Sequence, residues 1–436
     1  IESFDPFNSP GAKGHLTYIN SNAFYNKRYV NQIIDTKTIL SDESAYTIEY
    51  LNFDDITGLP TKIKTLDPGT AESQIQEITY AHELYPELGP KSLNTSNENL
   101  LQIKAREKIT KDGELIAGSN TTFRNTFPVR SFNNGNYQTS IQTEEWQPHK
   151  TFIFNGQTDV NLWREQMEYT LFDERGTALE KKYLGDRYEA AIYGYDDRYL
   201  IAAVSDAKYT ECAFSGAEDP IDATRFGGEV SRQALTILNT DSTYIHTGVK
   251  SILASQHQYA FQYKTTIDGL DANRKYVAKV WVYDNGNNDA QLHYYFNSNS
   301  SGDLNGSGSG GSSTITGGTV DVNTGRILTA GNWHLLSITI SIPGYLAGSD
   351  ELVIQARNTG SNAAYFDDFR FHPINSIMVS YVYEPWSFLP EYVLGPENIY
   401  DRTEYDAIGQ RHRTYRETVD GEKVLTEQTF NYLRNQ

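Results

Sequence analysis

The chain has 436 residues, too many for one ordinary domain, so its length predicts two or three compact units. Its formal net charge of -19 leaves no basic surface for phosphate backbones, and we do not expect nucleic acid as a partner. The single cysteine, Cys212, excludes an intramolecular disulfide and is expected to be a buried apolar residue.

No run of 18 apolar residues occurs, so we expect no membrane-spanning helix. The chain begins at Ile1 without Met or a signal pattern, and we interpret it as a mature form or an excerpt. Its 31 Tyr, 19 Phe and 33 Gly favour pleated, half-buried strands joined by tight turns, which predicts an all-β fold class.

A short pattern of an aromatic residue, Asp and a following Gly marks three predicted hairpin turns. The three copies are Phe53-Asp54 with Gly58, Phe172-Asp173 with Gly176, and Tyr405-Asp406 with Gly409. The aromatic residue ends a strand, Asp bonds its own backbone in the turn, and Gly supplies a positive φ. Asp420-Gly421, followed by alternating residues, predicts a further hairpin. Hairpins laid side by side bury a shared aromatic face, which predicts an extended, curling sheet; ordinary hairpins of unrelated sandwiches are the alternative.

These segments resemble the YD-repeat, or RHS-type, proteins, in particular the long cell-surface proteins of Bacteroidota. The clearest match is 167–209, with its Tyr193-Gly194-Tyr195 step, and the likeness covers most of 1–210 and 376–436. The resemblance implies hairpins that spiral into a β-shell, which some members use to enclose a toxic C-terminal segment. It also implies export by the type 9 secretion machinery to the outer surface of a Gram-negative bacterium, with a role in adhesion or gliding.

Residues 211–373 differ from their flanks and predict an inserted jelly-roll β-sandwich. Strands are expected at 275–284, 335–342, 351–357 and 364–372. The Gly/Ser-rich tract at 298–318 is expected to be a mobile loop within this domain. The predicted domains are therefore a hairpin scaffold over 1–210, the sandwich over 211–373, and further YD-repeat hairpins over 374–436.

The insert resembles the galactose-binding-like carbohydrate-binding modules in its segments 213–219, 246–252, 275–284 and 365–371. The resemblance implies glycan as a partner and a structural Ca²⁺ site, carried over onto Glu218 and Asp367.

Strand alternation places Asp367 on one face with Tyr365, Phe369 and Phe371, where its buried carboxylate needs a partner. A cation would meet that need, and so would backbone N–H groups or Arg370. Alternation places Asp368 on the opposite, solvated side.

Aromatic rings that stack on pyranose rings are the usual sugar platform. The candidates for ligand binding are Trp281, Tyr283, Tyr294 and Phe296. A sandwich core also needs aromatic residues, so core packing is the alternative for each of them.

No nucleophile with its base is recognisable, and His246 and His372 are expected to be structural. We therefore expect no catalysis and predict a secreted, adhesive scaffold with one carbohydrate-binding module. The alternatives are the shell of a polymorphic toxin whose catalytic domain lies outside this chain, and a purely structural shell.

Overall fold

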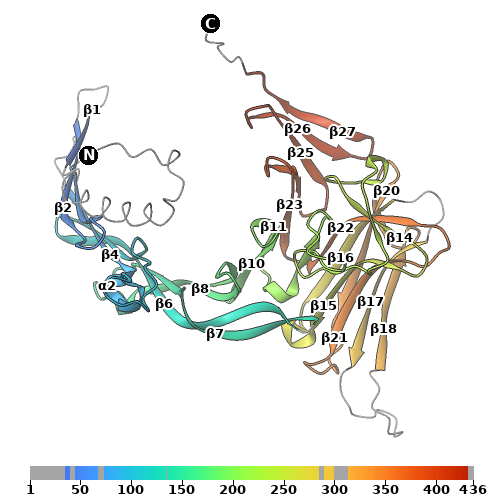
Figure 1. Cartoon of the computed structure of the whole chain (residues 1–436), viewed down its shortest axis with the longest axis horizontal. Helices are drawn as coiled ribbons and strands as arrows, with labels where there is room; N and C mark the ends of the chain where they lie inside the picture. The colour runs from blue at the N-terminus through green and yellow to red at the C-terminus, as the bar shows by residue number, and fades with distance from the viewer. Residues whose placement is uncertain are drawn as a thin grey trace, which may run out of the picture. The chain divides into compact units, whose positions relative to one another are not determined.

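A computed structural model of the chain describes residues 35–39, 45–66, 73–133, 135–283, 289–298 and 313–430. The chain forms two compact units (Figure 1). Unit 1 comprises Ile1–Val129 and Ser140–Thr170, and unit 2 comprises Arg130–Thr139 and Leu171–Gln436. Nearly all regular structure in the described residues is strand, which confirms the all-β fold class. None of the described helices is long and apolar enough to span a lipid bilayer.

The strands of unit 1 pair with one another in chain order. They are β1 (Asp35–Ile39), β2 (Ala45–Phe53), β3 (Pro60–Leu66), β4 (Ser73–Tyr80), β5 (Lys104–Lys111), β6 (Glu114–Asn133), β7 (Asn136–Ile153) and β8 (Arg164–Asp173). Short helices lie between strands: α2 (Ala81–Leu84), η1 (Pro86–Leu88) and η2 (Val160–Leu162). A small core under the β4–β5 connection holds Ala81, Leu88, Ala105 and Phe123.

Unit 2 contains a second run of antiparallel hairpin strands that a long insert interrupts. The strands before the insert are β9 (Ala178–Tyr183), β10 (Arg187–Gly194) and β11 (Tyr199–Ser205). Those after it are β23 (Ile377–Tyr383), β24 (Pro390–Leu394), β25 (Tyr400–Tyr405), β26 (Arg411–Thr418) and β27 (Gly421–Glu427). Strand β11 pairs directly with β23, from Ala202 opposite Ser380 to Ser205 opposite Ile377. The insert therefore occupies the place of a hairpin turn.

The insert is a sandwich of a seven-stranded and a four-stranded sheet. The larger sheet holds β12 (Ala213–Ser215), β13 (Ile237–Asn239), β14 (Ser251–Ala254), β16 (Lys275–Tyr283), β19 (Arg326–Ala330), β20 (Trp333–Ser341) and β22 (Ala364–Pro373). The smaller sheet has the order β15 (Tyr259–Thr266), β21 (Glu351–Asn358), β17 (Ala290–Ser298), β18 (Ser313–Asp321). Short turns of 3-10 helix are η3 (Tyr209–Glu211), η4 (Ser242–Tyr244) and η5 (Ile267–Gly269).

The core of the sandwich lies between its two sheets, with Phe261, Leu292, Phe296 and Phe369 among its buried side chains. The alternation predicted for 335–342 is confirmed, because Leu336 and Ile340 are buried while Thr339 is exposed. Much of the Gly/Ser-rich tract, residues 299–312, lies outside the described residues. Its flanking strands β17 and β18 pair with each other, which confirms that the tract connects neighbours within one sheet.

The predicted aromatic-Asp-Gly turns of unit 2 have the expected hydrogen bonds. Asp173 Oδ1 accepts from the N–H groups of Arg175 (2.9 Å) and Thr177 (2.7 Å). Asp406 Oδ1 accepts from the N–H groups of Ile408 (3.0 Å) and Gln410 (2.8 Å). Gly176 and Gly409 follow with φ of 80° and 79°. The carboxylate therefore closes each turn, as the sequence predicts.

Unit 1 has the same turn at Asp54, whose Oδ1 accepts from the N–H groups of Ile56 (3.2 Å) and Thr57 (2.6 Å). Sequence inspection missed a further copy, Tyr383-Glu384, in unit 2. Glu384 Oε2 accepts from the N–H groups of Trp386 (3.1 Å) and Ser387 (2.5 Å). Phe388, with φ of 54°, takes the position that Gly occupies elsewhere. A longer acid and a missing Gly hid this copy from pattern matching.

Gly194 in the Tyr193-Gly194-Tyr195 step permits close packing between β10 and a loop of the sandwich. A Cβ added at Gly194 would overlap Asp219 Oδ2 and lie 3.0 Å from Ile201 Cγ2. Asp219 is buried, and its Oδ2 accepts from the N–H of Gly227 at 3.2 Å. Only a residue without a side chain fits at this contact.

Replacing Gly194 by Ala should destabilise unit 2 by about 1–3 kcal/mol, because the added methyl overpacks a buried contact. The control is Gly344→Ala, since nothing lies within 4 Å of a Cβ added there. Urea unfolding of the full chain measures both, and equal midpoints for the two variants would contradict the contact.

Candidate functional site

The outer face of the seven-stranded sheet is covered by the chain's own hairpin strands. Trp281 on β16 has no exposed surface, and its Nε1 donates to the backbone oxygen of Asn398 at 2.8 Å. Its ring stacks on the His246 imidazole with centroids 4.2 Å apart. On the same sheet, Arg370 Nη1 donates to the backbone oxygen of Gly395 at 2.8 Å. This face therefore forms an internal interface between the seven-stranded sheet and the β24–β25 connection, which we call the joint.

A buried charged cluster lies at the centre of the joint. His246 Nδ1 lies 2.7 Å from Asp368 Oδ2, and Nε2 lies 2.7 Å from Glu417 Oε1 on β26. Burial alone would lower the pKa of His246, but the carboxylates of Glu417 and Asp368 raise it to about 10. The imidazole is therefore positively charged at neutral pH and donates from both nitrogens. This supports the prediction that His246 is structural.

The prediction that Trp281 and Phe296 bind sugar is wrong, because both side chains are buried. Trp281 is covered in the joint, and Phe296 is 2% exposed in the sandwich core. Tyr294 is partly buried and packs against the same core. Tyr283 lies on the other sheet, where its ring makes an edge contact with Tyr244 at 5.0 Å. The structure does not bring these four residues together into one platform.

A break in the alternation of β22 corrects the predicted placement of its two Asp residues. Asp368 has a φ of 48°, and the register between β16 and β22 shifts beside it. Phe369 and Phe371 therefore point into the core, whereas Asp367 lies opposite Trp281 on the joint side. Asp368 is not solvated as predicted but fully buried, because it binds His246.

The two predicted Ca²⁺ ligands already have backbone partners. Glu218 Oε1 accepts from the N–H groups of Val249 and Lys250, both at 2.7 Å. Asp367 Oδ2 accepts from the N–H of His246 at 2.9 Å. Burial raises the pKa of Glu218 to about 8 and that of Asp367 well above its usual value. Among the described residues, no group of three or more Asp, Glu, His or Cys side chains could hold a metal ion. The Ca²⁺ site therefore stays a prediction.

The outer face of the four-stranded sheet carries a row of planar polar and aromatic side chains. Strand register places Gln262, Gln355, His293 and Thr319 side by side across its four strands. The next row holds Lys264, Val353, Tyr295 and Thr316, and Arg357 lies opposite Gln291 and Tyr259 at the other side of the first row.

Hydrogen bonds and ring stacking hold these side chains in place. Gln355 Nε2 donates to Gln262 Oε1 at 2.8 Å, and His293 Nδ1 lies 2.7 Å from Thr319 Oγ1. The His293 and Tyr295 rings stack with centroids 5.5 Å apart and an interplanar angle of 29°. Burial, together with the positive charge of Arg357, lowers the pKa of His293 to about 4, so this imidazole is neutral. The face is thus a pre-organised surface of rings and amides.

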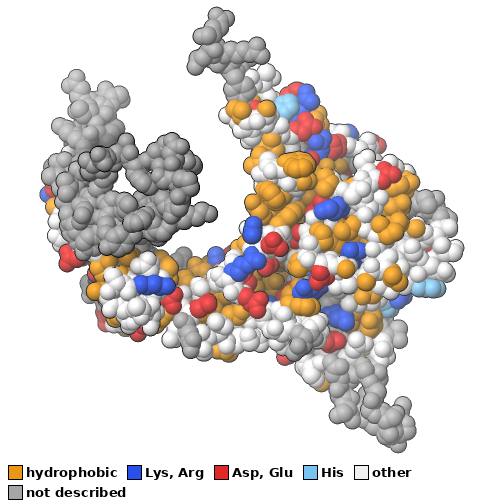
Figure 2. All heavy atoms as spheres, in the orientation of Figure 1, with side chains coloured by type: hydrophobic (Ala, Val, Ile, Leu, Met, Phe, Trp, Pro, Cys, Tyr) orange, Lys and Arg blue, Asp and Glu red, His pale blue; other side chains and the backbone are white. Residues whose placement is uncertain are grey.

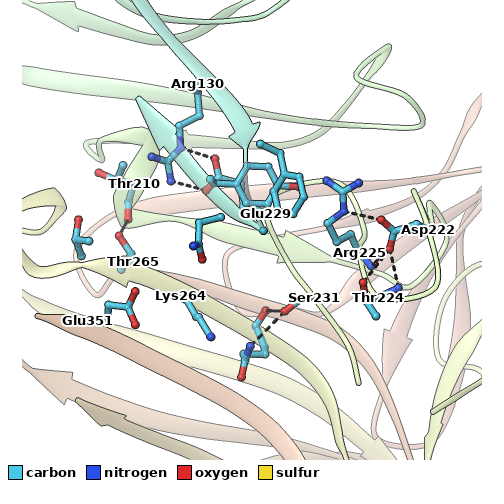
Figure 3. A pocket seen from close by; sticks show the side chains of 16 residues that line it. Arg130, Thr210, Asp222, Thr224, Arg225, Glu229, Ser231, Lys264, Thr265 and Glu351 are labelled. Atoms are coloured by element: carbon cyan, nitrogen blue, oxygen red, sulfur yellow. Dashed lines mark hydrogen bonds and ion pairs between the residues drawn. The ribbon is translucent and has the colours of Figure 1, made fainter. Parts of the chain in front are cut away.

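A cavity of about 540 Å³ adjoins the β15 edge of this face. Its lining includes Gln262, Lys264 and Glu351 from the sheet and Arg130 and Glu229 from the other side (Figure 3). Arg130 Nε and Nη2 donate to the two oxygens of Glu229, each at 2.7 Å, which closes that wall with a bidentate ion pair. The rows of the sheet face therefore continue into a polar hollow.

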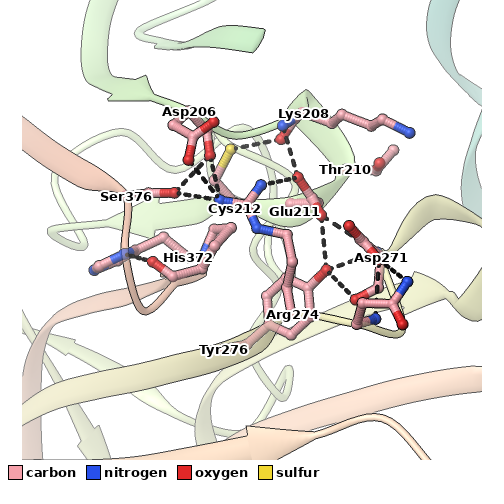
Figure 4. Close-up of polar contacts among 12 residues, drawn as sticks. Asp206, Lys208, Thr210, Glu211, Cys212, Asp271, Arg274, Tyr276, His372 and Ser376 are labelled. Atoms are coloured by element: carbon pink, nitrogen blue, oxygen red, sulfur yellow. Dashed lines mark hydrogen bonds and ion pairs between the residues drawn. The ribbon is translucent and has the colours of Figure 1, made fainter. Parts of the chain in front are cut away.

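The entry of the chain into the sandwich is fixed by a separate polar cluster around Glu211 (Figure 4). Glu211 is 1% exposed and accepts hydrogen bonds from Tyr276 Oη (2.7 Å) and from the N–H of Lys208 (2.9 Å). Cys212 is buried, as predicted, and its thiol donates to the backbone oxygen of Lys208 at 3.0 Å. His372 Nδ1 lies 2.8 Å from the backbone oxygen of Pro373, which supports the structural role expected for His372. All these contacts anchor the two crossings between scaffold and sandwich.

The sequence-based prediction chose the wrong face of β17. The residues on its outer face are the alternate ones, one position away from those predicted. In the run from 291 to 296, Leu292, Tyr294 and Phe296 point to the core, so His293 and Tyr295 point outward. The alternation of that run was available in the sequence, but both phases carry aromatic rings. Composition therefore could not tell which phase is solvated.

No protein-family model matches the chain, and no curated protein matches it. Among solved structures, the chain is similar to the CBM22-1 xylan-binding domain from Paenibacillus barcinonensis Xyn10C, at 15% identity and a TM-score of 0.24 over 37% of this chain and 92% of that one. It is also similar to a family 30 carbohydrate-binding module of a Clostridium thermocellum cellulosomal cellulase, at 14% identity and a TM-score of 0.21 over 33% of this chain and 86% of that one.

The His246 cluster predicts a pH-dependent stability. The pKa of His246 is raised from 6.5 to about 10 on folding, so its stabilisation is full below pH 6.5 and is lost as pH rises through about 10. His246→Gln should lower the free energy of unfolding by about 3–5 kcal/mol at neutral pH, because Asp368 and Glu417 stay buried without a cation. Thermal unfolding of both proteins across this range measures the difference, which should shrink towards pH 10; a constant difference would rule out the titration.

The predicted Ca²⁺ site has a direct test in the same assay. If Glu218 and Asp367 bind Ca²⁺, the unfolding midpoint of the full chain should be higher in CaCl₂ than in EDTA, because a ligand of the folded state stabilises it. Glu218→Gln should remove that difference. Identical midpoints for the unmodified chain in both solutions would contradict the site.

Proposed function

We propose that this chain is a non-catalytic hairpin scaffold that carries a carbohydrate-binding sandwich. The glycan binds on the outer face of the β15-β21-β17-β18 sheet, over His293, Tyr295 and Gln355. The observation that supports this most strongly is the stacked His293–Tyr295 pair beside amide side chains that are already held by hydrogen bonds. The opposite face of the sandwich is occupied by the joint around Trp281.

The chemistry of this face suits a sugar. A pyranose ring presents apolar C–H groups on its faces and hydroxyl groups around its edge, so it needs an aromatic surface flanked by groups that donate and accept. Tyr295 supplies the surface, and the amide of Gln355 lies one row away on the neighbouring strand, where it is hydrogen-bonded to Gln262. Side chains that bind one another before the ligand arrives lose little further freedom on binding.

The scaffold supports a role in display. Four turns of the aromatic-acid type organise the described hairpins, and we propose that these are YD repeats of an exported protein at the outer cell surface. Within that proposal, the type 9 secretion machinery exports the chain, and glycan binding serves adhesion or gliding. On the face seen in Figure 2, Lys and Arg side chains stand among Asp and Glu rather than in a continuous basic surface. That distribution supports a glycan rather than nucleic acid as the partner.

Replacing Tyr295 by Ala should weaken glycan binding at least tenfold, because the ring is the stacking surface of the proposed site. The full chain is first applied to a broad glycan array, and the best ligand is then titrated by calorimetry. The matched control is Tyr283→Ala, since Tyr283 is a partly buried ring on the other sheet.

Near-ultraviolet circular dichroism establishes that both variants are folded. Two results would contradict the proposal: a folded chain that binds no glycan on the array, or binding that survives Tyr295→Ala but is lost with Tyr283→Ala.

A further inference from the structure

We infer that the glycan bound by this face carries carboxylate groups, as a uronic-acid polysaccharide does, and that Arg357 binds one of them. This inference rests on the proposed glycan site and adds the class of its ligand. Arg357 stands on β21, opposite Gln291 on β17 and Tyr259 on β15. It therefore lies on one of the two inner strands, beside the strand that carries Tyr295, within reach of a glycan stacked on that ring.

The guanidinium of Arg357 is weakly satisfied. Its Nε and Nη2 donate to the same oxygen, Gln291 Oε1, at 3.4 and 3.3 Å, which is long for such bonds. Among the described residues, no carboxylate lies within ion-pair distance of it. Burial lowers the pKa of Arg357 below its usual value, so the charge has lost part of its hydration without gaining an anionic partner. An incoming carboxylate would restore what burial removes.

Five other arginines of unit 2 have stronger hydrogen bonds than Arg357. Arg130 binds Glu229, Arg402 binds Glu422, and Arg416 binds Asp401, each through paired hydrogen bonds of 2.7–2.8 Å. Arg232 and Arg370, which are buried, donate to backbone carbonyls at 2.7 and 2.8 Å. The chain has 56 acidic and 37 basic residues. A shortage of acids therefore does not explain why the half-buried Arg357 has no acidic partner in the described part of the chain.

The sheet face around Tyr295 carries cations although the whole chain is acidic. Lys264 is exposed and shares a row with Tyr295, with Val353 between them, and Arg357 lies two rows away on the same sheet face. Two acids lie nearby: Asp321 stands on the row of Arg357, opposite Gln291, and Glu351 stands opposite Asn297, one row beyond Tyr295. Asp321 Oδ1 already accepts from the N–H groups of Asn323 and Thr324, both at 2.9 Å.

A carboxylate fits this site better than a sulfate. The planar guanidinium fork matches the two coplanar oxygens of a carboxylate, and the free Nη1 and Nη2 hydrogens of Arg357 can both reach them. Uronic acids also carry one charge per sugar, so the net charge of -19 repels them less than it repels a densely sulfated chain.

The test compares acidic polysaccharides with their own neutral forms on the full-length chain. The probes are glucuronoxylan, pectate and alginate, each beside the carboxyl-reduced material, in which the carboxylate has become a hydroxymethyl group. We expect about a tenfold preference for the acidic form, the size of one charge-assisted hydrogen bond. The preference should decline as salt is added, because part of it is screened.

Arg357→Gln should remove the preference while retaining binding to the reduced forms. The matched control is Arg326→Gln, which removes an exposed cation of β19 on the other sheet and should keep the preference. Arg357→Lys, which keeps the charge without the fork, should retain only part of it.

Each other result overturns a different statement. Equal binding of acidic and reduced forms by the unmodified chain would refute the inference and leave the proposed glycan site standing. A preference for sulfated glycans over their desulfated forms, without one for uronic acids, would refute the carboxylate. A preference that survives Arg357→Gln would refute the role of Arg357, and a folded chain that binds none of these polysaccharides or any array glycan would contradict the proposed function itself.

Discussion

The charged cluster of His246, Asp368 and Glu417 is the interaction on which the arrangement of unit 2 depends. It joins a loop of the sandwich, the bulge of β22 and strand β26, which lie far apart in the sequence. Burying three charges is costly, and it is tolerated here because both imidazole nitrogens and both carboxylates are paired at 2.7 Å. The Trp281 ring and the Asn398 carbonyl complete the contact around it. Together these groups decide which face of the sandwich is covered.

The consequence for function is geometric. The sandwich replaces the turn between β11 and β23, so the hairpin sheet continues past it with its hydrogen bonds intact. One sheet of the sandwich packs on the hairpins that follow, and the other sheet keeps a face of rings, amides and one weakly satisfied guanidinium. The attachment of the sandwich to the scaffold therefore leaves the face of the four-stranded sheet uncovered by the joint. This arrangement is what the proposed display role requires.

Local patterns in the sequence predicted the elements well, because their causes are local. The Asp173 and Asp406 turns depend on an acid and a Gly a few residues apart, and the strand at 335–342 depends on simple alternation. The site was harder. Trp281 is a good platform by residue type, and only the distant Asn398 and Glu417 show that it is covered. Simple alternation places Asp367 and Phe369 on the same face of β22. The bulge at Asp368 puts them on opposite faces, and no sequence pattern marks that bulge. Tyr295 and Phe296 differ only in strand phase, which packing decides.

Hydroxyl-radical footprinting of the full chain, with and without its best glycan, tests whether the four-stranded face is the glycan-binding surface. Tyr295 and His293 should become protected from oxidation on binding, while Tyr283 on the other sheet and Trp386, which is 91% exposed, should stay as reactive as before. Protection of Tyr283 or Trp386 with unchanged labelling of Tyr295 would place the ligand elsewhere and contradict the assignment of the four-stranded face.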